Sequence, residues 1–317
     1  MTGPARAANM MGAMGPESPR FAVLGPGGVG GLLAALLARA GSSVVVLAGE
    51  ETSRAIAERG IRLESKKFGD FTVPVRTATR LAEAVDACFI TVKATQLDEA
   101  LERVPATALG GGLVVPFLNG IDHVGRLRSV YPPASVVAAT IRVETARVEP
   151  GVIRQLSPFA AVELAASGDN RERVGALAAQ LLATGLDVRV RDDETAMLWD
   201  KLAMLAPLAL LTTHERGNVG MVRARRRDDA VAVINEVVAV ARAEGSTVDA
   251  EKVIGMIDQA PESMESSMQR DQAGGRPLEV DAIGGAVLRH AEKAGIAVPM
   301  TRRLVDELEA RSKRPAT

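Results

Sequence analysis

The sequence is poor in cysteine and in net charge, and each shortage excludes a class of protein. The single cysteine, Cys88, cannot form an internal disulfide, which argues against a disulfide-rich secreted scaffold and favours a reducing compartment. The 38 lysines and arginines nearly balance the 39 aspartates and glutamates, so no overall field attracts nucleic acid or an anionic membrane. We therefore expect a cytoplasmic protein that binds neither.

Long apolar segments and metal-binding patterns are also missing. The longest apolar run, residues 202–211, is far shorter than the roughly 20 residues that a membrane-spanning helix needs, and it predicts a buried helix. Residues 1–20 contain no apolar core of the kind found in secretory signals, so we expect a flexible N-terminal extension. The histidines have no metal-ligand spacing to one another or to Cys88, and no metal is expected.

An apolar strand, a glycine-rich turn and an apolar helix follow one another in residues 21–40. The turn, Gly25-Pro26-Gly27-Gly28-Val29-Gly30, has the spacing of a dinucleotide-binding motif. Gly25 permits the tight turn, Gly27 lets the backbone approach a pyrophosphate, and Gly30 lets the helix pack closely on the strand. A second apolar strand, residues 43–48, completes a βαβ unit, which favours cofactor binding by these six residues over a glycine-rich turn that binds nothing.

Apolar runs and helical periodicity divide the rest of the chain into two halves. In the first half they predict strands at residues 61–64, 71–75, 87–92, 113–118 and 187–190, and helices at 53–59, 96–104 and 170–184. This alternation is typical of a parallel, doubly wound sheet, and Pro150-Gly151 within residues 143–156 predicts a hairpin that begins an antiparallel edge.

Helical periodicity dominates from about residue 193 onward. It predicts helices at residues 195–211, 225–244, 253–259, 280–294 and 301–310. We therefore expect an α/β, Rossmann-type dinucleotide-binding domain over residues 21–191, followed by an all-α domain over residues 192–317 that binds substrate and offers a possible dimer face.

Three polar positions stand out in otherwise apolar surroundings. Lys93 follows a buried strand, at the end of a parallel sheet where ligands bind. Asn119-Gly120 follows the next strand, although this dipeptide is also an ordinary turn. Lys201 heads an apolar helix, where a lysine is usually just a solvated helix end.

Taken together, these segments resemble the ketopantoate reductases (2-dehydropantoate 2-reductases). The matching segments occur in family order from residue 21 onward, namely Gly25 to Gly30, Val92-Lys93-Ala-Thr-Gln, Leu118-Asn119-Gly120, Trp199-Asp-Lys201-Leu, Ser266 to Asp281, and Ile296-Ala-Val-Pro299. The resemblance implies a Rossmann domain followed by a helical domain, with the active site between them. It also implies NADPH-dependent reduction of ketopantoate to pantoate, a step toward pantothenate and coenzyme A.

The resemblance also implies roles for individual residues. Lys201 would be the general acid that protonates the carbonyl oxygen, and Glu279 would orient Lys201 or bind a substrate hydroxyl. Ser267 and Asn119 would hydrogen-bond the substrate, while Lys93, Asn119 and Glu279 would also face the cofactor. Without the resemblance, Glu279 reads as an ordinary acid in the first turn of a helix.

Two departures from the family pattern leave the substrate and the cofactor open. Two asparagines usually follow the catalytic lysine on its helix, and here Leu205 and Ala209 stand in their places. An arginine usually follows the second strand to receive the 2′-phosphate of NADPH, and here Gly49-Glu50 follows it, with Arg54 further on. The resemblance implies NADP as the cofactor. NAD stays possible, because an acid at this place binds the ribose hydroxyls of NAD.

We expect an oxidoreductase that acts on a small 2-keto acid, ketopantoate by default. The alternatives are a related reductase for a more apolar 2-keto acid and a non-catalytic NAD(P)-sensing protein. A pure sensor would not need the pair of Lys201 and Glu279.

Overall fold

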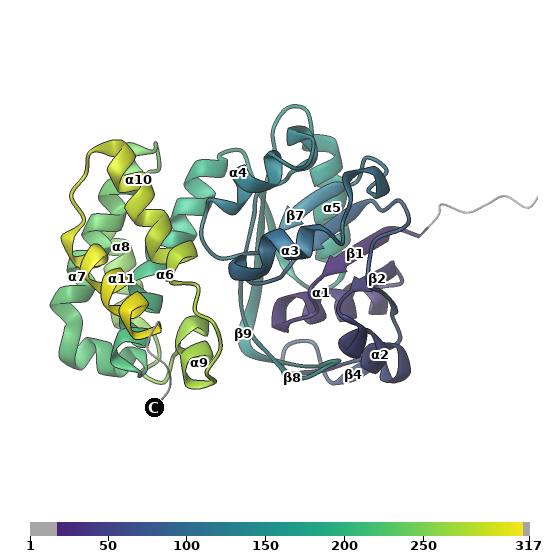
Figure 1. Cartoon of the computed structure of the whole chain (residues 1–317), viewed down its shortest axis with the longest axis horizontal. Coiled ribbons are helices and arrows are strands. Elements are labelled where there is room, and N and C mark those ends of the chain that lie inside the picture. Colours follow the sequence, from purple (N-terminus) through teal and green to yellow (C-terminus); the bar gives the residue numbers. More distant parts are fainter. Residues whose placement is uncertain (1–17, 313–317) are drawn as a thin grey trace, which may run out of the picture.

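The computed structural model describes residues 18–312 and has two lobes (Figure 1). All strands of the described chain lie in the N-terminal lobe, and the last of them is β10 (Asp187–Arg191). From α6 (Glu194–Glu215) onward every described element is a helix. The predicted architecture, an α/β unit followed by a helical region, is confirmed. Most of the predicted N-terminal extension, residues 1–17, lies outside the described residues.

Five strands form the parallel sheet of the N-terminal lobe. They are arranged in the order β5-β2-β1-β6-β7, with β1 (Arg20–Leu24), β2 (Ser43–Leu47), β5 (Arg76–Ala78), β6 (Ala87–Ile90) and β7 (Leu113–Pro116). The chain builds one side of this sheet from β1 outward and then returns to build the other side from β6. The point between β1 and β6 is therefore the switch point at which ligands bind in such sheets.

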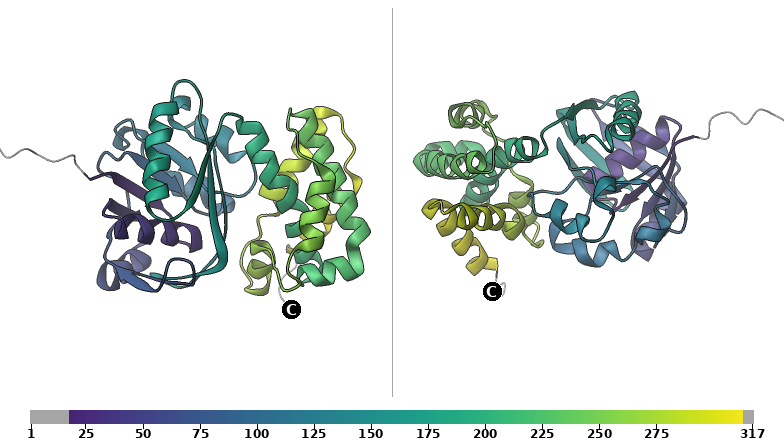
Figure 2. Two further views of the ribbon diagram at one scale, coloured as in Figure 1. Left: turned by 180° about the vertical axis from the view of Figure 1, so that it is seen from behind. Right: turned by 90° about the horizontal axis from the view of Figure 1, so that it is seen from above.

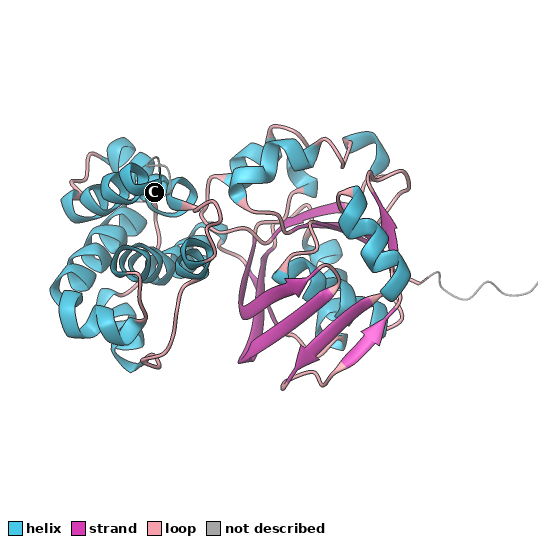
Figure 3. Ribbon diagram, turned by 60° about the horizontal axis from the view of Figure 1, so that its bottom comes forward, coloured by secondary structure: helices cyan, strands magenta, loops and turns pink. Residues whose placement is uncertain are grey.

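The remaining strands form a second, mixed sheet, which corrects one expectation from the sequence. The predicted hairpin is present as β8 (Ala139–Glu149) and β9 (Val152–Ala165), but it does not form an edge of the first sheet. Instead β9, which is 14 residues long, pairs in parallel with β3 (Ile61–Ser65) and with β10. A short strand, β4 (Phe71–Val73), completes this sheet (Figure 3).

Helix α1 (Gly28–Arg39) lies between the two sheets. It contacts β1 and β2 on one side and β3, β8 and β9 on the other. Because both sides are covered, residues 30–37 are all buried, and the helix is apolar all round instead of amphipathic. A side chain at Gly28 would collide with Thr145 of β8, and one at Gly31 with Ile153 of β9. These glycines allow the second sheet to pack against the helix.

Short helices connect the strands of the N-terminal lobe. They are α2 (Glu50–Arg59), η1 (Ala94–Gln96), α3 (Leu97–Leu101), η2 (Ala106–Ala108), α4 (His123–Arg128), η3 (Pro133–Ser135) and α5 (Arg171–Ala183). Helix α2 begins three residues before the predicted position, so Glu50 opens its first turn. The sequence did not predict α4 or β5.

Helix α6 is the centre of the helical lobe (Figure 2). It contacts α7 (Val219–Ala243), α8 (Ala250–Gln259), α9 (Ser267–Ala273) and α11 (Pro299–Ser312); η4 (Asp281–Gly285) and α10 (Ala286–Ala294) precede α11. By length and composition alone α6 could cross a membrane, but 67% of its apolar window is buried inside this lobe. It is a core helix, longer than the apolar run that predicted it.

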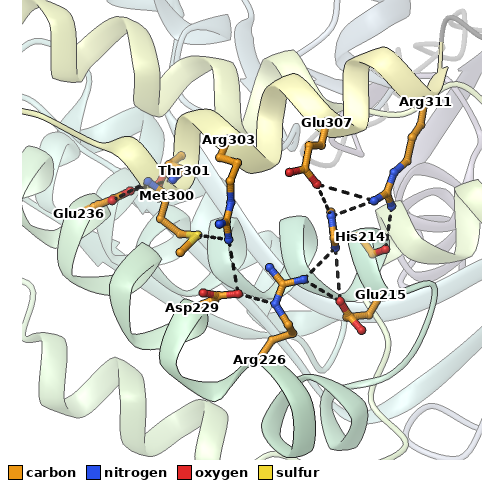
Figure 4. Close-up of polar contacts among 10 residues, drawn as sticks. All are labelled: His214, Glu215, Arg226, Asp229, Glu236, Met300, Thr301, Arg303, Glu307 and Arg311. Carbon is orange, nitrogen blue, oxygen red and sulfur yellow. Dashed lines mark hydrogen bonds and ion pairs between the residues drawn. The ribbon is translucent and has the colours of Figure 1, made fainter.

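The last helix, α11, is held at both ends (Figure 4). Glu236 of α7 accepts hydrogen bonds of 2.8 Å from two backbone N–H groups in the first turn of α11. At the other end, the His214 ring lies 2.6 Å from Glu307, and Arg311 donates to the His214 carbonyl at 2.9 Å. These contacts fix α11 against α6 and α7.

Candidate active site

The glycines of the turn after β1 serve two different purposes. Gly25 has a φ of +86°, and a side chain there would lie 2.5 Å from Val92. A side chain at Gly30 would lie 2.3 Å from both the Gly25 carbonyl oxygen and the Thr91 hydroxyl oxygen. A side-chain Cβ at Gly27, by contrast, would have no neighbouring atom within 4 Å. The fold itself requires Gly25 and Gly30, whereas Gly27 borders open space.

The start of α1 can hold a dinucleotide pyrophosphate. Gly27 is its N-cap residue and supplies no side-chain cap, so backbone N–H groups of the first turn remain available to an anion. Their partial positive charge, together with the open space at Gly27, fits a phosphate that approaches the backbone closely. Thr91 supports the turn by donating to the Gly25 carbonyl at 2.8 Å.

Charges of both signs lie near the end of β2. Glu50 is exposed in the first turn of α2, directly after its N-cap Gly49, and Arg54 is exposed one turn further on. Arg103, which the sequence did not single out, donates to the Ala48 carbonyl at 3.1 Å. This end of the sheet therefore offers an acid for ribose hydroxyls and arginines for a phosphate.

Glu279 connects the two lobes. It precedes η4 in the helical lobe and is only 3% exposed. Its carboxylate accepts hydrogen bonds from the Ala94 N–H at 3.0 Å, the Asn119 side-chain amide at 3.2 Å and Lys93 at 3.3 Å. The residues that donate follow β6 and β7, so the carboxyl ends of both strands meet this helical-lobe carboxylate.

Lys93 is held by a second carboxylate that the sequence did not single out. Asp271 of α9 accepts a hydrogen bond from the Lys93 ammonium at 2.5 Å and one from Arg276 at 2.9 Å. Burial lowers the pKa of Lys93, but Glu279 and Asp271 outweigh this effect and raise it above its ordinary value. Lys93 is therefore fixed as a cation. Asp271 lies in the segment that carries the family resemblance, which is the signal that could have found it.

Lys201 is half-buried near the start of α6, not a solvated helix end. Its ammonium lies 3.5 Å from the carbonyl oxygen of Leu118, the residue before Asn119. Burial and the positive charge of Arg142 lower the pKa of Lys201 to about 8, against the opposing effect of Glu279. Within the described chain no hydrogen bond joins Lys201 to Glu279, so the two interact through their charges.

His123 lies in the same region, at the start of α4. It is 5% exposed, and among the described residues neither of its ring nitrogens has a hydrogen-bond partner. Burial and the nearby charge of Lys201 lower the pKa of His123 to about 3, against the opposing effect of Asp122. The ring is therefore neutral at physiological pH, and sequence reasoning about metal sites gave it no role.

The other predicted substrate positions lie on α6 and α9. Ser266 caps α9 by accepting from the Gln269 N–H, and it bonds Thr212 of α6 at 2.8 Å. Ser267, the next residue and the one predicted to bind substrate, is half-buried and makes no side-chain hydrogen bond within residues 18–312. Leu205 is half-buried and Ala209 is fully buried, so only Leu205 of this pair retains accessible surface.

Comparison with known proteins identifies relatives over nearly the whole described chain. A family model described as "Ketopantoate reductase PanE/ApbA" matches residues 21–167, and its C-terminal companion matches residues 193–312. A 2-dehydropantoate 2-reductase from Mycobacterium tuberculosis is 32% identical over 93% of this chain and 98% of its own length. One from Halobacterium salinarum is 30% identical over 90% and 97%.

Solved structures share this fold. A PanE/ApbA family ketopantoate reductase from Ralstonia eutropha superposes with a TM-score of 0.83, at 29% identity, over 93% of this chain and all of its own. A D-mandelate dehydrogenase solved with NADH and anilino(oxo)acetate has a TM-score of 0.86 over 92% of this chain and 98% of its own, at 22% identity. The latter similarity concerns the fold alone.

The glycine geometry predicts that two substitutions in the turn act differently. Gly27→Ala should leave thermal unfolding unchanged but weaken NADPH binding by about tenfold or more, because its methyl group fills the space next to the backbone donors. Gly30→Ala should cost about 1–3 kcal/mol of stability through overpacking. Fluorescence titration and thermal denaturation measure the two effects.

Gly175→Ala is the matched control for this pair. It also places a methyl group in open space, on α5 and away from the turn, so it should change neither property for the worse. Wild-type NADPH affinity in Gly27→Ala would contradict the assignment of the turn to the pyrophosphate.

Proposed function

The chain belongs to the ketopantoate reductase family of oxidoreductases, and we propose that it reduces 2-dehydropantoate (ketopantoate) to pantoate with NADPH. The observation that carries the proposal is Lys201, a lysine whose burial lowers its pKa to about 8 beside the carbonyl of Leu118. We place the reaction in the cytoplasm, in the synthesis of pantothenate and coenzyme A.

Lys201 acts as the general acid in this proposal. The glycine turn of residues 25–30 would hold a reduced nicotinamide dinucleotide, which would supply the hydride, and negative charge would then develop on the ketone oxygen of the substrate. The Lys201 ammonium stabilises this charge and donates a proton to the oxygen. A pKa of about 8 suits the role, because the group is mostly protonated at neutral pH and releases its proton readily.

Glu279, Asn119 and Ser267 orient the substrate. Because Glu279 accepts from the Asn119 amide at 3.2 Å, it fixes the direction in which that amide presents its oxygen and its second N–H. Ser267 has a hydroxyl free of bonds to the described residues and can serve the substrate. Lys93, with Asn119, faces the nicotinamide side.

A second candidate is a reductase with the same chemistry that prefers a more apolar 2-keto acid. The observation in its favour is Leu205, which exposes an apolar side chain four residues after Lys201, on the same side of α6. The test of both candidates is to follow the loss of NADPH absorbance with a panel of 2-keto acids that includes ketopantoate and ketoisovalerate.

Replacing Lys201 tests the proposed acid. Lys201→Ala should lower kcat by about two to four orders of magnitude with NADPH affinity unchanged. In the wild type, kcat/KM should fall as pH rises through about 8, because the ammonium loses the proton that it donates. Lys252→Ala, an exposed lysine of α8, is the control and should behave as the wild type. Near-normal turnover in Lys201→Ala would remove Lys201 from the mechanism.

The charges at the end of β2 predict a weak cofactor preference. NADPH should be favoured over NADH, but modestly, because Glu50 repels a 2′-phosphate that Arg54 and Arg103 attract. Glu50→Gln should raise the ratio of kcat/KM for NADPH to that for NADH, while Glu51→Gln, its exposed neighbour, should not. A strong NADH preference in the wild type would show that Glu50 decides the choice.

The apolar side chain of Leu205 predicts weak discrimination between substrates. A site that hydrogen-bonds a hydroxyl rejects the analogue without it by about 10⁴-fold or more, whereas an apolar wall distinguishes far less. Ketoisovalerate, which lacks the hydroxyl of ketopantoate, should therefore be reduced with a penalty well below ~10⁴ in kcat/KM. Leu205→Asn should widen the gap. Complete rejection of ketoisovalerate by the wild type would mean that other residues bind the hydroxyl.

A further inference from the structure

Arg142, on β8, carries a positive charge that neither the sequence motifs nor the proposed mechanism uses. Its Nη1 donates to the Glu163 carboxylate of β9 at 2.9 Å, and its side chain remains 36% exposed. The other guanidinium nitrogens, Nε and Nη2, form no hydrogen bond to the part of the chain that the structure describes. Arg142 therefore combines a fixed anchor with free donors.

Glu163, the anchor of Arg142, is linked through Arg191 to the helix that carries Lys201. Glu163 is 7% exposed and also accepts from Arg191 at 2.9 Å, and Arg191 donates to Asp200 at 3.2 Å. Asp200 directly precedes Lys201 in α6. Burial raises the pKa of Glu163, but the two arginines outweigh this and hold it below its ordinary value, so the anchor stays charged.

The strand that carries Arg142 borders the helical lobe. β8 contacts α6, and Glu144, two residues after Arg142, accepts from Arg270 of α9 at 3.0 Å. In the ribbon views β8 and β9 run along the side of the N-terminal lobe that faces α9 (Figures 1 and 2). Arg142 thus lies at the junction between the lobes, near enough for its charge to lower the pKa of Lys201.

Two neighbouring cations at this junction favour an anion that can contact both. We infer that Arg142 binds the carboxylate of the 2-keto acid substrate while Lys201 faces the adjacent ketone oxygen. The inference rests on the proposed function. A planar guanidinium matches a carboxylate with paired N–H donors, and a 2-keto acid places its carboxylate next to the carbonyl that is reduced. The apolar side chains of Leu205 and Ala209 cannot hydrogen-bond the substrate carboxylate, which leaves this contact to Arg142.

The competing explanation is that Arg142 only neutralises Glu163. That role would make Arg142 important for folding and equally important for every substrate. Carboxylate recognition instead predicts an effect that depends on the charge of the substrate. The two explanations separate when an acid is compared with a neutral ketone of the same shape.

The test measures kcat and KM at saturating NADPH for two pairs of substrates. It compares ketopantoate with its neutral lactone, and ketoisovalerate with its neutral methyl ester. Arg142→Gln should raise KM for the acids by about 10- to 100-fold, the size expected for a lost charge-assisted contact, and change kcat less. For the neutral ketones kcat/KM should change by less than about threefold, since they lack the carboxylate. Arg142→Lys keeps the charge beside Glu163 and should show a smaller rise in KM.

Arg154→Gln is the matched control. Arg154 is also a strand arginine held by a glutamate, with its Nε 2.9 Å from Glu64, and it is 51% exposed on β9. Its replacement should change neither KM nor the ratio between acids and neutral ketones. Should Arg142→Gln unfold, the comparison rests on Arg142→Lys, for which equal effects on acids and neutral ketones would overturn the inference.

Failure of the inference and failure of the proposed function give different results. A wild type that reduces none of the 2-keto acids refutes the proposed function. Calorimetric binding of ketoisovalerate to the NADP⁺-loaded protein then tests Arg142 without turnover. Binding to Arg142→Gln that is weaker than to the wild type, or lost, supports the inference; equal binding to both proteins, or no binding to the wild type, overturns it. A wild type that reduces the acids, with Arg142→Gln affecting acids and neutral ketones alike, refutes only the role of Arg142.

Discussion

A buried carboxylate must find partners wherever the chain places it, and this constraint organises the junction between the two lobes. Glu279 comes from the helical lobe, yet its hydrogen-bond donors follow β6 and β7 of the N-terminal lobe. Breaking the junction would leave the carboxylate without these bonds, at a free-energy cost of several kcal/mol for an unpaired buried charge. The contacts that place the lobes against each other are thus the contacts that assemble Lys93 and Asn119.

The glycine turn likewise combines packing with ligand binding, within one lobe. Gly25 and Gly30 have no room for a side chain, so the close approach of α1 to β1 and to residues 91–92, which follow β6, depends on them. That close approach aims the uncapped start of α1 at the switch point of the sheet. The second sheet then covers the other side of α1, with Gly28 and Gly31 against β8 and β9. One helix therefore supplies both the core of the lobe and the donors for an anion.

Local patterns in the sequence predicted the strand, turn and helix of residues 20–47 and most helices of the second lobe, because their periodicity is contained in short windows. The second sheet was missed because β9 pairs with β3, some 90 residues away, and the sequence of a strand does not show which strand it pairs with. The same limit applies to the site. Lys201 reads as a solvated helix end until the packing of α6 partly buries it. Asp271 and Arg142 gain meaning only from contacts that the fold creates, Asp271 with Lys93 across the lobes and Arg142 with Glu163 on the neighbouring strand.

The surroundings of the two lysines of the site, Lys93 and Lys201, shift their pKa values in opposite directions. Both are partly buried, which lowers the pKa of each, but Lys93 contacts two carboxylates and ends above its ordinary value. The Lys201 ammonium, among the described residues, hydrogen-bonds the Leu118 carbonyl oxygen alone, and its pKa ends near 8. A group with a high pKa keeps its charge throughout a reaction, and a group with a pKa near neutrality can release a proton. The distribution of carboxylates around the junction thus makes Lys93 suited to hold charge in place and Lys201 suited to transfer a proton. Glu279 reinforces this division, because it binds Lys93 directly and acts on Lys201 only through its field.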